Sequence, residues 1–160
     1  MKTGLKFLAI SILVLADPCF AQKTSEVRHM RFGYTILYVS NLAATLTFYE
    51  KAFGFEPGIS IEGQYAELKT GTTTLAFAQE DFVKTLTNQP FTPADASKPA
   101  PPVELGFVTD AVQVDFDRAI AAGAIEVKKP EMKPWGQTVG YVRDLNGFLV
   151  EICTPIKMES

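Results

Sequence analysis

The chain has 160 residues with 15 basic and 18 acidic side chains, which give a net charge of −3 at pH 7. Neither sign of charge gathers into a block, so the composition argues against a nucleic-acid partner. His29 is the only histidine, and Cys19 and Cys153 are the only cysteines. One imidazole excludes the metal sites that need several histidine ligands, such as an iron triad with two histidines.

Residues 1–21 have the pattern of a secretory signal peptide. Lys2 and Lys6 precede an apolar run over residues 7–16, and Cys19-Phe-Ala21 provides a small-x-small cleavage site. The apolar run of about ten residues is too short for a membrane span, which needs roughly 20. We therefore expect an exported, periplasmic protein with no membrane segment after cleavage. Cys153 would then be its only cysteine, so no intrachain disulfide is expected.

After a polar leader over residues 22–30, one strand–helix unit occurs twice along the chain. The first copy is a strand over 34–41, a helix over 42–53 that ends at Gly54, and strands over 59–62, 64–69 and 72–78. The second copy is a strand over 104–110, a helix over 111–122 that ends at Gly123, and strands over 126–128, 135–143 and 148–153. Residues 88–102, with five prolines, form the linker between the copies.

Local signals support the two helices. Asn41 is expected to cap the first helix, and Asp110 with Gln113 forms a capping-box-like pair for the second. Each helix ends at a glycine, as a left-handed cap requires. Residues 144–147 form a four-residue turn between the last two strands.

A repeated unit that cannot bury its own apolar face packs against its copy. The sequence therefore predicts one α+β domain over residues 31–155, in which two βαβββ modules form a cup-shaped mixed β-sheet with the helices outside. Strand alternation places Leu37, Phe77, Phe107 and Ile152 under the helices. The opposite face is mixed in character, as expected for the lining of a ligand pocket.

Two motifs, Phe48-Tyr-Glu-Lys-Ala-Phe-Gly-Phe55 and Asp144-Leu-Asn-Gly-Phe-Leu-Val-Glu151, together with the paired modules, resemble the vicinal oxygen chelate superfamily. That superfamily includes glyoxalase I, extradiol dioxygenases and bleomycin-resistance proteins. The resemblance covers about residues 31–155.

The resemblance implies a metal site at one residue on the first and last strand of each module. Those places fall on Tyr34, Ala76, Glu104 and Glu151, and only Glu151 matches the usual ligand type. A neutral phenol is a poor ligand for divalent ions, and alanine cannot coordinate a metal. We therefore expect no tightly bound transition metal and no cofactor. Any divalent ion would be held weakly by Glu104 and Glu151.

Glu151 and Glu104 are the candidate catalytic residues. For Glu151 three roles remain open: a buried carboxylate held by hydrogen bonds, a general acid or base, or a metal ligand. Glu104 is either a carboxylate at the pocket rim or part of the site. Alternation points both carboxyl groups into the cup, so we expect them to face one another across it, with Tyr34 nearby and the pKa of at least one of them raised.

The candidate ligand-binding residues are Tyr34, Trp135, Gln137, Tyr141 and Arg143. Trp135 either stacks on a flat ligand or simply packs, and Arg143 either binds an oxyanion or pairs with Asp144 or Glu151.

Two functions remain open. The first is a protein that binds a small ligand in its cup without a transition metal and forms a homodimer. The second is a lyase or isomerase similar to glyoxalase I that uses Glu151 and Glu104 as metal ligands or as acid and base.

Overall fold

The computed structural model describes residues 30–156, and nearly all of them belong to the compact unit that begins at Phe32. The signal peptide predicted at residues 1–21, the leader as far as His29, and Cys19 lie outside these residues. No helix within residues 30–156 is long and apolar enough to cross a membrane.

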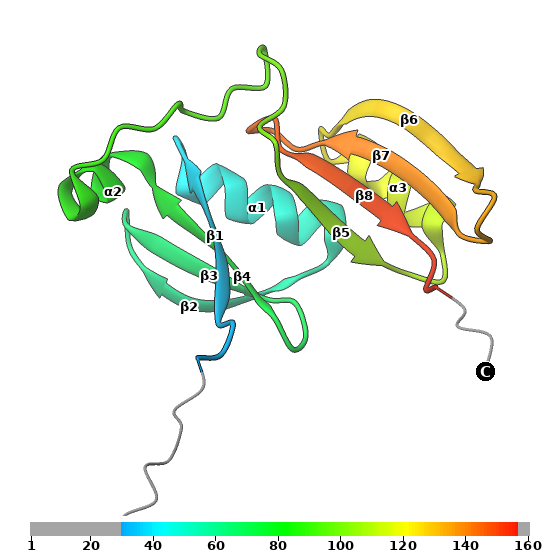
Figure 1. Ribbon diagram of the computed structural model, residues 1–160, viewed down its shortest axis with the longest axis horizontal. Coiled ribbons are helices and arrows are strands. Elements are labelled where there is room, and N and C mark those ends of the chain that lie inside the picture. The colour runs from blue at the N-terminus through cyan, green and yellow to red at the C-terminus, as the bar shows by residue number, and fades with distance from the viewer. Residues whose placement is uncertain (1–29, 157–160) are drawn as a thin grey trace, which may run out of the picture. The chain divides into compact units, whose positions relative to one another are not determined.

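The described residues form eight strands and three helices, and Figure 1 shows their arrangement. Along the chain these are β1 (Tyr34–Val39), α1 (Leu42–Phe53), β2 (Glu56–Ile61), β3 (Tyr65–Lys69), β4 (Thr74–Gln79), α2 (Glu80–Thr87), β5 (Glu104–Val108), α3 (Val112–Ala121), β6 (Ile125–Met132), β7 (Thr138–Arg143) and β8 (Leu149–Cys153).

The strands form two four-stranded sheets of the same topology, in the order β1-β4-β3-β2 and β5-β8-β7-β6. In each sheet the first and last strands of the module pair in parallel and the other neighbours pair antiparallel. The predicted α+β fold of two βαβββ modules is therefore confirmed. The two sheets are separate, and no strand pairing among residues 30–156 closes them into one.

Helix α1 has the caps that the sequence predicts. The side chain of Asn41 accepts a hydrogen bond from the backbone N–H of Ala44 at 3.0 Å, and Gly54 adopts a left-handed conformation with φ of 73°. The N–H of Leu42 also donates to Oε1 of Gln79 at 3.1 Å. The backbone N–H groups of Leu42 and Ala44, which have no partner within the helix, are thus hydrogen-bonded to side chains.

The predicted capping box of the second helix is wrong. Ala111 occupies the N-cap position of α3 without a side-chain cap, and Gln113 donates to Asp117 instead. Thr109 takes over the role, because its hydroxyl accepts from the N–H of Ala111 and donates to Asp115. A residue before the helix can therefore organise its first turn without the S/T-x-x-E spacing.

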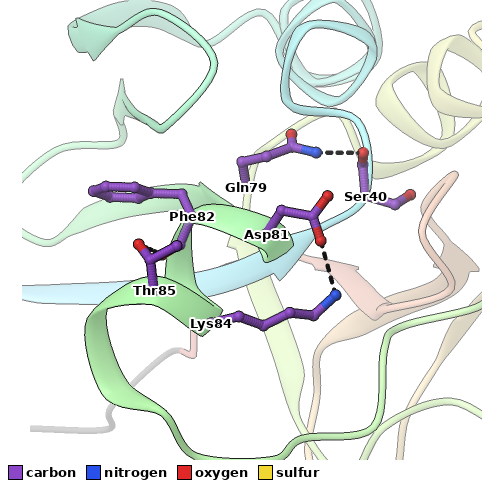
Figure 2. A network of polar contacts seen from close by, with 6 residues as sticks. All are labelled: Ser40, Gln79, Asp81, Phe82, Lys84 and Thr85. Carbon is purple, nitrogen blue, oxygen red and sulfur yellow. Dashed lines mark hydrogen bonds and ion pairs between the residues drawn. The ribbon is translucent and has the colours of Figure 1, made fainter.

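Helix α2 was not predicted from the sequence. It follows β4 without a loop, and Figure 2 shows its first turn, where Asp81 pairs with Lys84 at 2.8 Å. Beside it, Nε2 of Gln79 donates to the carbonyl of Ser40 at 2.6 Å (Figure 2). Gln79 thus ties the end of β4 to the start of α1.

The core lies between the helices and the sheet faces that they cover. Helix α1 packs on the first sheet and α3 packs on the second, and the two helices contact each other. Leu37, Phe77 and Ile152 are buried as predicted, and Phe107 packs edge-on against Phe53 at 4.9 Å between ring centroids. The assignment of sheet faces from strand alternation is confirmed.

Helix α1 is also joined to the second module by polar contacts. The hydroxyl of Tyr49 donates to Asp144, the amide of Asn146 donates to the hydroxyl of Thr45, and Nε of Arg118 donates to the carbonyl of Ala52. The three α1 positions are four and then three residues apart, so they share one helix face. Directional contacts along this face fix how the two modules pack.

The linker contacts both modules. Near its start, the ring of Phe91 lies edge-on to Tyr38 of β1, 5.1 Å between centroids. At its middle, the Arg143 guanidinium donates to the carbonyls of Ala96 at 3.1 Å and Asp95 at 3.4 Å.

Candidate functional site

The candidate site lies on the face of the second sheet that α3 does not cover, which we call the second cup face. Leu105, Val150 and Ile152 are buried on the α3 side, so Glu104, Gly106 and Glu151 lie on the opposite side. The strand register places Gly106, Glu151 and Tyr141 in one row across β5, β8 and β7.

Tyr141 and Glu151 form the central pair of this face. The tyrosine hydroxyl donates to Oε2 of Glu151 at 2.8 Å. This hydrogen bond, followed by desolvation and the charge of Glu151, raises the pKa of Tyr141 to about 12. Tyr141 is therefore a neutral hydrogen-bond donor to Glu151 at neutral pH.

Glu104 and Glu151 are close together, but the expectation that they face one another across the cup is wrong. Both belong to the second module and lie side by side, since Glu104 is two residues before Gly106, the partner of Glu151 on the neighbouring strand. Desolvation raises the pKa of Glu104, and the charge of Glu151 and a hydrogen bond with it add to this rise. The pKa of one acid is thus raised, as predicted, but the two carboxyl groups interact because they lie on the same face of one sheet.

Cys153 completes this cluster at the end of β8. Its side chain is buried, and burial, a hydrogen bond to Glu151 and the nearby acidic charges raise the pKa of the thiol to about 11. A thiol with such a pKa is almost entirely protonated at neutral pH, so it is a poor nucleophile.

Lys133, which sequence reasoning missed, also lies on this face. Its side chain is only 11% exposed, its Nζ pairs with Glu131 at 2.5 Å, and it lies 5.7 Å from the centroid of the Tyr141 ring. Lys133 is the first residue of the short loop between β6 and β7. No local pattern predicts this contact, because it depends on the conformation of the loop between β6 and β7.

Trp135 and Gln137 lie on the same loop. The indole N–H of Trp135 donates to Oε1 of Gln137 at 2.8 Å, and Nε2 of Gln137 donates to the carbonyl of Thr154 at 2.6 Å. The Trp135 side chain remains 62% exposed, so its ring is open to a ligand.

Arg143 has a different set of partners from either predicted role. Its guanidinium donates to the carbonyls of Gly147, Ala96 and Asp95, and no ion pair joins it to Asp144 or Glu151 among residues 30–156. Arg143 therefore fastens the linker to the turn between β7 and β8.

Tyr34 lies on the first module, 58% exposed, with Thr74 as its partner on β4. Close to it, the hydroxyl of Tyr65 donates to Glu67 at 2.8 Å, and Glu67 is the strand partner of Ala76. Sequence reasoning also missed this Tyr–Glu pair. It is similar to the Tyr141–Glu151 pair, except that Tyr65 and Glu67 lie on one strand, whereas Tyr141 and Glu151 lie on neighbouring strands. Alternation on β3 could have indicated it.

A groove of about 450 Å³ follows β5, the edge strand of the second sheet. The first module forms its other wall, with Thr35 of β1, Phe55, Thr70 and Thr73 of the β3–β4 turn, and Thr74 and Leu75 at the start of β4. Among residues 30–156, the only charged side chain that lines it is that of Glu104. Glu151 lies one strand further in and does not line the groove.

The metal site that the resemblance implies does not fit these residues. Ala76 has no donor atom, and the neutral phenol of Tyr34 is a poor ligand for divalent ions. Within residues 30–156 no three His, Cys, Asp or Glu side chains are grouped as metal ligands. Glu104 and Glu151 alone would offer a hard cation only two carboxylates.

Comparisons with known proteins agree with the fold. A protein-family model, the glyoxalase-like domain, matches residues 32–157. The structure is similar to a glyoxalase-related enzyme from Fulvimarina pelagi, with a TM-score of 0.68 and 22% identity over 79% of this chain and 89% of that one. A search of curated proteins gives no significant match.

Two further structures extend the comparison. A glyoxalase/bleomycin resistance protein/dioxygenase from Nocardioides has a TM-score of 0.64 and 18% identity, covering 87% of this chain and 92% of that one. Lactoylglutathione lyase from Agrobacterium tumefaciens has a TM-score of 0.56 and 26% identity, covering 81% and 96%.

The fold and the family match together define an α+β protein of the vicinal oxygen chelate superfamily, as the resemblance predicted. Within it, the chain belongs to the glyoxalase-like domain family.

Proposed function

We propose that this protein binds a small hydrogen-bond-donating or cationic ligand on its cup faces, without a transition metal. The observation that carries the proposal is the position of Glu151, a half-buried carboxylate that neighbours a second carboxylate and is held by Tyr141. Such a group favours a ligand that donates hydrogen bonds or carries positive charge. The exposed rings of Trp135 and Tyr34 add aromatic faces that attract cations.

The lining of the β5 groove supports the same choice of ligand. Beside apolar side chains, the groove has threonines and one carboxyl as polar groups, and no basic side chain lines it within residues 30–156. The charge of Glu104 would repel an anionic ligand there. This argues against an anionic conjugate as the ligand.

We also propose that the protein is exported to the periplasm and that it forms a homodimer. The signal-peptide pattern of residues 1–21 supports export. Exposed apolar side chains on edge strands support a second copy, at Ile36 of β1 and at Ile59 and Ile61 of β2. The amino-terminal residue of protein recovered from the periplasmic fraction, measured by mass spectrometry, tests the first point.

A matched set of probes tests the ligand class. Benzylamine, benzyl alcohol and benzoate share one ring and differ in charge, and NMR chemical shifts of Tyr141 and its neighbours report their binding. We expect benzylamine to bind best and benzoate least, and Glu151→Gln to remove that order. Benzoate binding as well as benzylamine, or an unchanged order in Glu151→Gln, would contradict the proposal.

A second candidate function is a lyase or isomerase that moves a proton with Glu104 and Glu151. The raised pKa of Glu104 beside a second carboxylate favours it, because one group can then donate a proton to a substrate while the other accepts one from it. Exchange of the α-protons of small aldehydes and ketones with D₂O, followed by NMR, separates the two functions. Catalysed exchange that Glu151→Gln abolishes would favour the enzyme, and its absence would favour the binding protein.

A further inference from the structure

Gly106 of β5 lies at a place where neither backbone nor packing requires a glycine. Its φ is not among the positive values that six other glycines show, so any residue can adopt its conformation. A Cβ built at Gly106 would have no heavy atom within 4 Å. Glycine inside a strand costs roughly 0.5–1 kcal/mol relative to alanine, so its presence needs another reason.

Gly140 on β7 shows what a glycine required by packing looks like. A Cβ there would meet the Phe116 ring and the Pro130 ring, both at 3.0 Å. Gly140 therefore makes room for the side chains of Phe116 on α3 and Pro130 on the neighbouring strand β6, whereas Gly106 faces open space.

The first module shows that the fold accepts a large side chain at the matching place. Ile36 is the strand partner of Ala76 on β4, as Gly106 is the partner of Glu151 on β8. Ile36 is 43% exposed on the corresponding face. Both partners therefore differ between the modules. In the first module a large side chain, Ile36, lies beside Ala76, and in the second a glycine lies beside the carboxylate of Glu151.

The gap lies between the β5 groove and Glu151. Gly106 lines the groove between Glu104 and Val108, and its neighbour across the strand pair is Glu151. A glycine in a strand commonly marks a point where a ligand approaches the backbone closely.

We propose that Gly106 is a specificity-determining residue, whose missing side chain lets an ammonium, hydroxyl or similarly small donor group of a ligand pass from the groove to Glu151. The proposal rests on the binding function proposed above. It limits the ligand to one whose donor group is narrow and terminal, because Glu104 and Val108 flank the gap on the same strand.

Chemical labelling tests access to Glu151 without any ligand. A water-soluble carbodiimide with glycine ethyl ester couples to accessible carboxyl groups, and peptide mass spectrometry measures the extent at each site. We expect Gly106→Val to slow labelling of Glu151 roughly fivefold or more, and Gly106→Ala to have a smaller effect. Labelling of Glu126, exposed on β6, should stay unchanged.

The stability of the variants shows whether Gly106 is needed for access to Glu151 or for packing. Gly106→Val should unfold at the same or a higher urea concentration than the wild type, whereas Gly140→Ala should be destabilised. Unchanged labelling of Glu151 in a folded Gly106→Val variant would overturn the proposal. A loss of stability in Gly106→Ala as large as that in Gly140→Ala would overturn it too.

Benzylamine titration distinguishes this proposal from the one it rests on. Loss of benzylamine binding in Gly106→Val, with binding retained in Gly106→Ala, supports both. If labelling changes as expected but the wild type does not bind benzylamine, the binding function fails and the access role of Gly106 stands. If Gly106→Val binds benzylamine like the wild type, the specificity role fails and the binding function stands.

Discussion

The hydroxyl of Tyr49 lies 3.0 Å from Oδ2 of Asp144, and both side chains are fully buried. Tyr49 belongs to α1 of the first module and Asp144 to the turn between β7 and β8 of the second. Burial raises the pKa of Asp144, although hydrogen bonds from Asn146, Phe148 and Tyr49 act in the opposite direction. This contact anchors one module to the other at a point where water cannot replace a lost partner.

Replacing Tyr49 with phenylalanine should therefore destabilise the protein by about 1–3 kcal/mol, because a buried carboxyl loses a donor. Urea unfolding followed by circular dichroism measures the change. Tyr65→Phe is the matched control, since Tyr65 donates to Glu67 on an open face where water can replace the hydroxyl. Equal losses in the two variants would contradict the anchoring role of Tyr49.

The raised pKa of Glu104 predicts how stability depends on pH. A carboxyl whose pKa is raised on folding adds stability below its ordinary value of 4.5, and that stability is lost as pH rises through the folded pKa. Glu104→Gln should thus become more stable relative to the wild type as pH rises from below 4.5 toward neutrality. Melting temperatures over this range measure it.

The charge of Glu151 contributes to the effect at Glu104, although desolvation is the larger cause. Glu104→Gln should consequently gain less with rising pH in a Glu151→Gln background. A gain of the same size in both backgrounds would show that the two carboxyl groups do not interact.

Cys153 should react slowly with thiol reagents. A rise in its pKa from 9.0 to about 11 lowers the thiolate fraction near neutral pH roughly 100-fold, and burial limits access further. Reaction with a disulfide reagent at pH 8, in a Cys19→Ser background, should be slow for the folded protein and fast in urea. Fast reaction of the folded protein would contradict the buried position of Cys153.

Purified protein should contain no stoichiometric nickel, zinc or iron after dialysis against a chelator. The reason is the donor set, because Ala76 replaces a ligand and the only histidine is His29. Elemental analysis by mass spectrometry checks this. One tightly held transition metal per chain would show that a different set of residues forms a site.

The protein should behave as a dimer in solution. Exposed apolar side chains on β1 and β2, at Ile36, Ile59 and Ile61, are the basis of this expectation. Light scattering coupled to size-exclusion chromatography gives the mass. Ile36→Lys should shift it toward the monomer, whereas Ala43→Lys, on an exposed α1 position, should not.

Local and repeating patterns by themselves determined most of the fold. Period-two alternation separated the buried residues Leu37 and Phe77 from the cup face, and Asn41 with Gly54 marked both ends of α1, because strand pleating and helix capping act over a few residues. The same reasoning missed α2, which has only eight residues and follows β4 directly, and it misplaced the cap of α3.

The site depended on contacts between distant parts of the chain, which only the tertiary structure decided. Sequence reasoning selected Glu104, Glu151 and Tyr141 and expected the two carboxyl groups to face one another across a cup. The strand order β5-β8-β7 places them side by side on one sheet. It could not assign Arg143 to linker carbonyls 47 residues away, nor bring Lys133 over the Tyr141 ring. Such contacts arise from the packing of whole modules and loops, and local sequence carries no record of which surfaces will meet.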